Sequence, residues 1–255
     1  MKGSILSVVS CCLLGFATLC AEEVPPPEKT TTIYMIGDST MANKSTEKGN
    51  PMKGWGQVFQ DYVLEDVVVA NRAVDGRSSR SFVAEGRWDK IMETLQPGDW
   101  VVIQFGHNDQ KKKKPAIYTD PEGDYREFLT GFVNDTRAKG ANPVLVTSIY
   151  RRYFTPEGRP KNSLGKYPQA TREVAAELDV PMVDLNVLTG ELLAEVGEED
   201  SKDLFVHFEA GEQPYYPNGI HDNSHLSEAG ARSIAQLFAE AVLILDIDFP
   251  VKAEQ

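Results

Sequence analysis

Two short segments of the chain hold the residue types that nucleophilic catalysis needs, and the first is Gly37-Asp38-Ser39. This tripeptide directly follows residues 33–36, an apolar run typical of a buried strand. A glycine and a serine at the end of a strand in a parallel sheet would place the hydroxyl of Ser39 at the edge where the sheet opens. The same residue types also form ordinary turns. A nucleophile at Ser39 is therefore a hypothesis that requires a base elsewhere in the chain.

The second segment lies near the C-terminal end and supplies a candidate base with a group to orient it. Asp222 and His225 are three residues apart on a predicted loop, just before a helix that we expect to begin near Ser227. One turn can bring the carboxylate to the imidazole and leave the other ring nitrogen free to take the proton of Ser39. His221 and His225 also have a spacing seen in metal sites, but no cysteine or third histidine lies at ligand spacing. We therefore expect Asp222 and His225 to serve Ser39, with no metal.

Two further segments could stabilise the negative charge that develops on a carbonyl oxygen during acyl transfer. Gly76 follows the apolar residues 67–70 and can present a backbone amide with no side chain in the way. Asn108 follows the apolar residues 100–105 and carries a side-chain amide. Each segment alone also fits a turn. If Ser39, Gly76, Asn108 and the Asp-His pair all lay in ordinary turns, however, four turns with catalytic residue types would have to meet by coincidence at the same predicted sheet edge.

Alternating apolar and amphipathic segments would position these residues. Short runs rich in β-branched residues predict five strands, at 33–36, 67–70, 100–105, 144–149 and 182–185. Amphipathic segments predict helices at 54–64, 88–95, 125–139, 168–178 and 227–245. This alternation predicts an α/β fold with an open, mostly parallel sheet covered on both faces. The longer loops, at 111–123, 151–166 and 198–219, could form a rim around the substrate.

The N-terminal residues differ from the rest of the chain. Residues 1–21 contain one charge, Lys2, and an apolar run too short to span a membrane, which predicts a signal peptide and a secreted or periplasmic protein. Residues 22–30 are a predicted linker, and residues 31–250 a single domain. All three cysteines lie in the predicted signal peptide, so we expect no disulfide in the mature chain. A lipoprotein anchor at Cys11 is the weaker alternative, because little apolar sequence precedes it.

The charge of the chain limits its partners. Without Lys2, 25 basic and 38 acidic residues leave a formal charge of 25 − 38 = −13. This balance argues against binding nucleic acid or anionic membranes, both of which favour clustered lysine and arginine. The one basic run, Lys111 to Lys114, fits either a solvated loop or a contact with an acidic polymer. Nothing in the sequence indicates an oligomeric state.

The ordered motifs around Ser39, Gly76, Asn108 and Asp222-x-x-His225 resemble those of the SGNH, or GDSL, hydrolase superfamily. Four longer segments are similar to rhamnogalacturonan acetylesterases, a carbohydrate esterase type: Gly37-Asp-Ser-Thr-Met-Ala42, Gly54-Trp-Gly-Gln57, residues 71–82 and His225-Leu-Ser-x-x-Gly230. The resemblance implies a three-layer α/β/α, flavodoxin-like fold and no cofactor. It also implies that Ser39 is the nucleophile, His225 the base and acid, and Asp222 its orienter, with an oxyanion hole from the Ser39 and Gly76 amides and the Asn108 side chain.

The same resemblance implies a serine esterase that removes O-acetyl groups from plant cell-wall polysaccharide, with the rhamnogalacturonan backbone of pectin as the expected substrate. Alternatives within the fold are an acetylesterase acting on xylan or another acetylated glycan, and a hydrolase of small acyl esters or thioesters. A non-catalytic glycan-binding protein is a further alternative, but such a protein need not retain a serine, an aspartate, a histidine and an oxyanion asparagine.

Several residues could contact a sugar polymer. Trp55 and Tyr215, with its neighbour Tyr216, could stack on sugar rings, although each could equally pack within the core or a loop. We also expect His107, beside Asn108, to contact the substrate. Arginines that follow predicted strands could bind a uronate or could form structural ion pairs. These arginines are Arg77, Arg80, Arg151 and Arg152.

Overall fold

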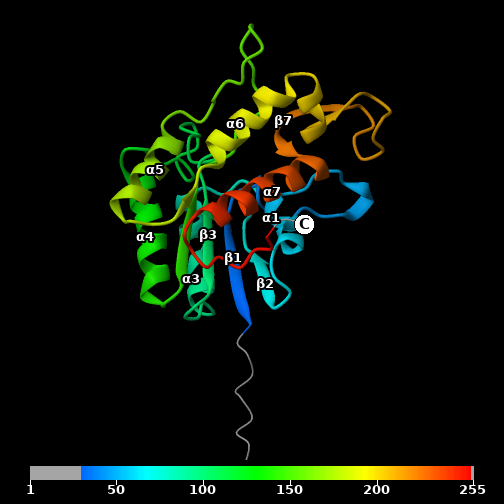
Figure 1. Cartoon of the computed structure of the whole chain (residues 1–255). Helices are drawn as coiled ribbons and strands as arrows, with labels where there is room; N and C mark the ends of the chain where they lie inside the picture. Colours follow the sequence, from blue (N-terminus) through cyan, green and yellow to red (C-terminus); the bar gives the residue numbers. More distant parts are fainter. Residues whose placement is uncertain (1–29, 254–255) are drawn as a thin grey trace, which may run out of the picture.

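A five-stranded parallel sheet forms the centre of the molecule, as the sequence predicted (Figure 1). The computed structural model describes residues 30–253, so the predicted signal peptide, its cysteines and nearly all of the predicted linker lie outside the described residues. The strands lie in the order β2-β1-β3-β4-β5, which is the order of flavodoxin-like folds. They are β1 (Thr31–Gly37), β2 (Val67–Asn71), β3 (Trp100–Gln104), β4 (Asn142–Val146) and β5 (Met182–Val183).

Helices cover both faces of the sheet and make the three predicted layers. The helices are α1 (Trp55–Val58), α2 (Ser79–Ala84), α3 (Arg87–Met92), α4 (Asp124–Ala138), α5 (Tyr167–Glu177), α6 (Leu185–Val196) and α7 (Glu228–Ile244). Short 3-10 helices occur at η1 (Glu47–Gly49), η2 (Phe59–Tyr62) and η3 (Asp200–Leu204). Within residues 30–253, no helix is both long and apolar enough to cross a membrane.

The two faces of the sheet are buried in two separate cores, because successive residues of a strand point to opposite sides. On β1, Ile33 and Met35 belong to the core beneath α1 and α7, whereas Tyr34 and Ile36 belong to the core beneath α2 to α5. Both sides of each central strand are therefore apolar, which explains why the sequence shows continuous apolar runs rather than alternation.

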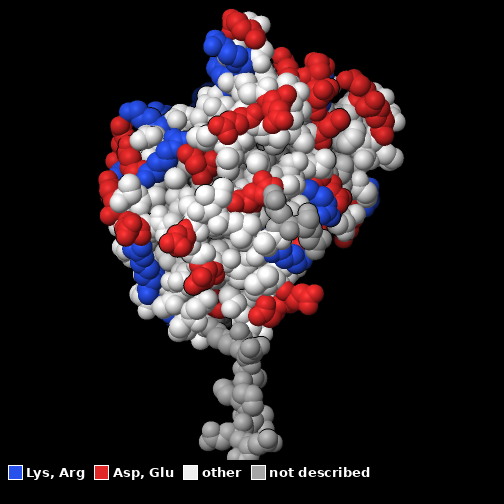
Figure 2. All heavy atoms as spheres, in the orientation of Figure 1, with Lys and Arg blue, Asp and Glu red and all other residues white. Residues whose placement is uncertain are grey.

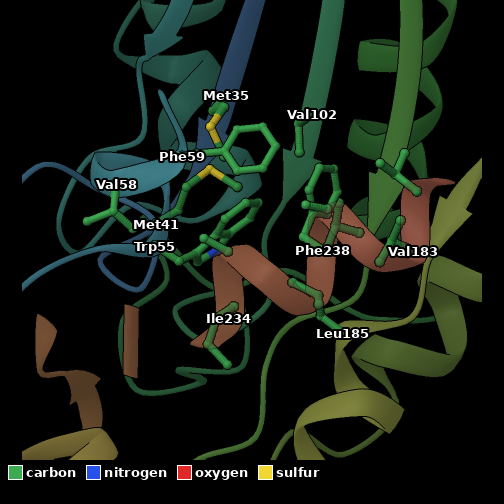
Figure 3. Close-up of a cluster of buried hydrophobic side chains, with 14 of the residues drawn as sticks. Met35, Met41, Trp55, Val58, Phe59, Val102, Val183, Leu185, Ile234 and Phe238 are labelled. Carbon is green, nitrogen blue, oxygen red and sulfur yellow. The ribbon is translucent and has the colours of Figure 1, made fainter. Parts of the chain in front are cut away.

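Trp55 lies in the first core, as Figure 3 shows, and does not face solvent. Its side chain is 0% exposed, packs against Phe59 and Phe238, and donates a hydrogen bond of 2.9 Å from Nε1 to Oε1 of Gln104. The prediction that Trp55 stacks on a sugar ring is therefore wrong. The short helix α1 turns this residue inward against the sheet.

Two helices were missing from the prediction, and local side-chain bonds account for both. Asp184 ends β5 early because its carboxylate accepts a hydrogen bond from the Val187 amide and caps α6. Ser78 and Ser81 exchange side-chain and backbone hydrogen bonds in a capping box that begins α2.

The C-terminal third of the chain adds a small antiparallel sheet that was also not predicted. Strand β6 (Phe205–Phe208) pairs with β7 (Ile220–Leu226), and Val206 lies opposite Asp222. Asp222 and His225 therefore lie on a strand rather than on the predicted loop. Strand β7 escaped prediction because its sequence, Ile-His-Asp-Asn-Ser-His-Leu, lacks alternating apolar residues. After it, Ser227 caps α7 by accepting a hydrogen bond of 3.1 Å from the Gly230 amide.

Candidate active site

Ser39 lies in a tight turn at the C-terminal end of β1, and its two preceding residues close that turn. A Cβ atom at residue 37 would lie 2.6 Å from the carbonyl oxygen of Gln104, so glycine is required where β1 passes β3. The buried carboxylate of Asp38 accepts hydrogen bonds from the Thr40 amide at 3.0 Å and the Thr40 hydroxyl at 2.9 Å. The turn leaves Ser39 at the edge of the sheet where sites of this fold class gather.

The structure brings Ser39, His225 and Asp222 into one line of hydrogen bonds. Nε2 of His225 lies 3.0 Å from Oγ of Ser39, and Nδ1 lies 2.7 Å from Oδ2 of Asp222. The other carboxylate oxygen of Asp222 accepts hydrogen bonds from the backbone amides of Ser224 and His225. This geometry suits a serine nucleophile, a histidine base and an aspartate that fixes the imidazole tautomer.

Asp222 is held as a carboxylate. Partial burial favours its neutral form, but the hydrogen bond and charge of His225, together with two backbone amides, lower the pKa of Asp222 to about 2. A negative charge therefore faces Nδ1 of His225 at any pH above this value. It would stabilise the imidazolium that forms when His225 takes a proton.

The predicted oxyanion donors lie on two loops that the structure joins. The amide of Val74 donates a hydrogen bond to the Gly37 carbonyl, which places the Gly76 loop beside the Ser39 turn. The side-chain nitrogen of Asn108 donates to the Arg77 carbonyl at 3.0 Å and keeps one further N–H hydrogen. In the described part of the chain, the amides of Ser39 and Gly76 donate no hydrogen bond. Both amides are therefore free to donate a hydrogen bond to an anion.

A buried carboxylate that sequence reasoning did not single out braces these loops. Oδ1 of Asp109 accepts hydrogen bonds from the amide and hydroxyl of Ser79 at 3.0 and 2.5 Å, and from the hydroxyl of Thr119 at 3.0 Å. Burial raises the pKa of Asp109 to about 6 in spite of these bonds. The position of Asp109 directly after Asn108 was the one sequence signal for this role.

His107 lies beneath the serine turn instead of lining the substrate site. Its two ring nitrogens are shielded from solvent, and Nδ1 lies 3.3 Å from Oδ2 of Asp38 without the alignment of a hydrogen bond. Burial lowers the pKa of His107. Burial by itself would raise the pKa of Asp38. The charge of the nearby His107 outweighs this effect and lowers the pKa of Asp38 to about 2. The prediction that His107 contacts the substrate is wrong, because its polar atoms cannot reach a ligand.

The other candidate contacts fall into two groups. Arg77 and Arg80 pair with Glu85 and Asp124, and Arg152 is buried, so these three arginines already have structural partners. Tyr215 is exposed and packs edge-on against Tyr216, so its contact with a sugar stays a prediction. Arg151 has no carboxylate partner among the described residues.

The alternative of a metal at His221 has little support in the geometry. Nε2 of His221 lies 3.8 Å from a Glu209 oxygen. Among residues 30–253, no three histidine, cysteine or acidic side chains are grouped so that they could hold a metal ion.

Comparisons with known proteins show the family to which the chain is similar. The model of the GDSL-like Lipase/Acylhydrolase family matches residues 35–232. Rhamnogalacturonan acetylesterase RhgT of Bacillus subtilis is 45% identical over 225 residues, which cover 88% of this chain and 94% of that protein. The rhamnogalacturonan acetylesterase of Emericella nidulans is 29% identical over 237 residues, which cover 86% of this chain and 87% of that protein.

Among solved structures, the protein YxiM of Bacillus subtilis superposes with a TM-score of 0.74 and 27% identity, over 86% of this chain and 58% of that one. The acetylxylan esterase Axe2 of Geobacillus stearothermophilus superposes with a TM-score of 0.58 and 17% identity, over 83% of this chain and 94% of that one. The likeness to Axe2 concerns the fold alone.

Proposed function

Because the chain belongs to the GDSL-like lipase/acylhydrolase family and is a carboxylic ester hydrolase, we propose that it removes O-acetyl groups from the rhamnogalacturonan backbone of pectin. The observation that carries the proposed chemistry is the hydrogen-bonded line from Ser39 through His225 to Asp222. The names of the relatives from Bacillus subtilis and Emericella nidulans support the proposed substrate.

In the first proposed step, Oγ of Ser39 attacks the acetyl carbonyl carbon while Nε2 of His225 takes the serine proton. The carbonyl oxygen becomes an oxyanion, which the free amides of Ser39 and Gly76 and the remaining N–H of Asn108 would stabilise. The tetrahedral intermediate then collapses, and the sugar oxygen leaves with the proton that His225 carried. Ser39 is left as an acetyl ester.

In the second step, a water molecule attacks the acetyl-enzyme and gives its proton to His225. The same donors would hold the second oxyanion, and collapse of this intermediate releases acetic acid as the proton returns to Oγ of Ser39. Asp222 keeps its charge throughout and stabilises the transient imidazolium.

Acetate release from acetylated rhamnogalacturonan, measured beside acetylxylan with Ser39→Ala as the blank, tests this proposal. Release from the pectic polymer that vanishes in Ser39→Ala supports both the mechanism and the substrate. Release from acetylxylan alone would overturn the proposed substrate, and release that survives in Ser39→Ala would overturn the mechanism.

We also propose that residues 1–21 direct export, which would place the enzyme where cell-wall polysaccharide is found. N-terminal sequencing of protein recovered outside the cytoplasm checks this, because the mature chain should begin near residue 22.

A further inference from the structure

Two cations beside the oxyanion loop have no carboxylate partner within residues 30–253. Nζ of Lys111 donates a hydrogen bond to Oδ1 of Asn108. Arg151 donates from Nη2 to the His107 carbonyl at 3.2 Å and from Nη1 to the Ser163 hydroxyl at 3.1 Å. The two cations therefore contact neighbouring residues of the same loop, although they are 40 positions apart in the chain.

Other cations of the described structure, Arg159 among them, also lack a carboxylate partner, so the position beside the oxyanion loop is what sets Lys111 and Arg151 apart. The protein has 38 acidic residues and 26 basic ones. Several other arginines do pair with carboxylates: Arg77, Arg80, Arg87, Arg126, Arg172 and Arg232. Acidic partners are thus plentiful in this protein, but none lies within ion-pair distance of Lys111 or Arg151 in the described structure.

Neutral groups hold the guanidinium of Arg151 in place. With its amide oxygen turned toward Arg151, Gln110 accepts hydrogen bonds from Nη1 at 2.7 Å and Nη2 at 2.9 Å. Burial lowers the pKa of Arg151, and burial together with the charges of Lys114 and Arg151 lowers the pKa of Lys111. The charge of the buried Asp38 opposes both shifts only in part, so a bound anion would offset the remaining cost of burying these cations.

The opposite charge dominates the segment that leads to β7. Residues 191–212 contain eight acidic side chains and one basic side chain, Lys202. Figure 2 shows acidic side chains gathered over α6 and the segment after it. An acidic polymer would be repelled by this segment and attracted to Lys111 and Arg151.

We propose that Lys111 and Arg151 form a carboxylate subsite, which binds a uronate group of the polysaccharide next to the acetyl group being removed. The inference rests on the proposed function. Lys111 contacts Asn108, so the subsite directly adjoins the predicted oxyanion hole. Lysine and arginine are also the side chains that bind carboxylates with charge-assisted hydrogen bonds.

Inhibition of 4-nitrophenyl acetate hydrolysis by an unacetylated rhamnogalacturonan oligosaccharide tests the subsite without requiring turnover of pectin. The same oligosaccharide with its carboxylates methyl-esterified is the uncharged probe. We expect the inhibition constant of the acid to rise about tenfold in Lys111→Gln and in Arg151→Gln, because each loses one charge-assisted contact. The inhibition constant of the methyl ester should stay the same.

Arg159→Gln is the matched control, because Arg159 is exposed and also lacks a carboxylate partner among the described residues. It removes the same charge away from the oxyanion loop and should leave both inhibition constants unchanged. Equal weakening of the acid and the methyl ester in Lys111→Gln and Arg151→Gln would show a structural brace and overturn the subsite. Failure of the acid to inhibit the wild type more strongly than its ester would also overturn it.

A different result would overturn the proposed function: a wild type that hydrolyses 4-nitrophenyl acetate but releases no acetate from acetylated rhamnogalacturonan.

Discussion

The two sides of the active site differ in how completely their polar groups are paired. On one side, Ser39, His225 and Asp222 bond to one another, and both oxygens of Asp222 have partners. On the other side, the Gly76 amide has no partner in the described structure, and no carboxylate there lies within ion-pair distance of Lys111 or Arg151. The first side is complete before a substrate arrives, whereas the second is arranged for negative charge that the protein does not itself supply.

The roles that we propose for the two sides account for this difference. A proton relay works only if its groups are already aligned, so internal hydrogen bonds serve it. Donors for an oxyanion are useful only if the protein leaves them unoccupied. A cation that attracts a carboxylate can instead be held by neutral groups, as Gln110 holds Arg151.

The largest effect should come from breaking the paired side at Asp222. Asp222→Asn retains an oxygen that can accept the Ser224 and His225 amides but loses the charge that faces Nδ1. We expect kcat on 4-nitrophenyl acetate to fall about 10⁴-fold, because the imidazolium loses its counter-charge and the tautomer is wrong. Unchanged thermal unfolding would show that the fold is intact. A fall of less than about tenfold would contradict the role of Asp222.

Removing the proposed oxyanion donor Asn108 should lower activity less than Asp222→Asn does. Asn108→Ala should lower kcat about 10²- to 10³-fold with little change in KM, because its N–H would act only on the developing oxyanion. Ser79→Ala is the control, since it weakens the brace to Asp109 between the same loops without removing a donor. If both variants lose activity equally, Asn108 acts by holding the loops together rather than by binding the oxyanion.

The buried carboxyl group of Asp109, which links the Gly76 and Asn108 loops, should also make the stability of the protein depend on pH. The pKa of Asp109 is raised to about 6, above its value in an unfolded chain, so folding favours the protonated acid. Its contribution is complete below about pH 4 and is lost as the pH rises through 6, at about 1.4 kcal/mol per unit of pKa shift. The wild type should therefore lose roughly 2 to 3 kcal/mol from this group between pH 4 and 7.

Urea unfolding of the wild type and Asp109→Asn at pH 4.5 and 7 measures this contribution. The variant should lose less stability over the interval than the wild type, because the amide does not ionise. Asp222 and Asp38 have a pKa of about 2, so the stability that they contribute is lost only below about pH 4. Parallel pH profiles for the two proteins would rule out the titration of Asp109.

The smallest effect should come from replacing Trp55, which lies in the first core and away from solvent. Trp55→Phe removes the hydrogen bond to Gln104 and part of a buried ring, so we expect a loss of about 1–2 kcal/mol in the free energy of unfolding. KM for an acetylated oligosaccharide should not change. A clear rise in KM without loss of stability would restore Trp55 as a sugar contact.

Much of the fold was predictable because it depends on local patterns. Continuous apolar runs predicted all five parallel strands, and amphipathic periodicity predicted α3, α4, α5 and α7 to within two residues or so at most ends. Helix α2 and strand β7 were missed because their signals, a serine capping box and a polar strand, do not depend on apolar periodicity.

The candidate residues at strand ends were also predictable, because a parallel sheet brings the C-terminal ends of its strands to one edge. Ser39 and Asn108 could therefore be placed at one edge from residue type and position in the chain, whereas Asp222 and His225, on the antiparallel strand β7, were found from their spacing before the last helix. Which side chains meet was decided only by the tertiary structure. Ser39 and His225 are 186 positions apart, and the burial of Trp55 and His107 and the lack of partners at Arg151 depend on packing between distant segments. Local periodicity does not encode such contacts, because the neighbours of a side chain are set by how the helices and loops pack around the sheet.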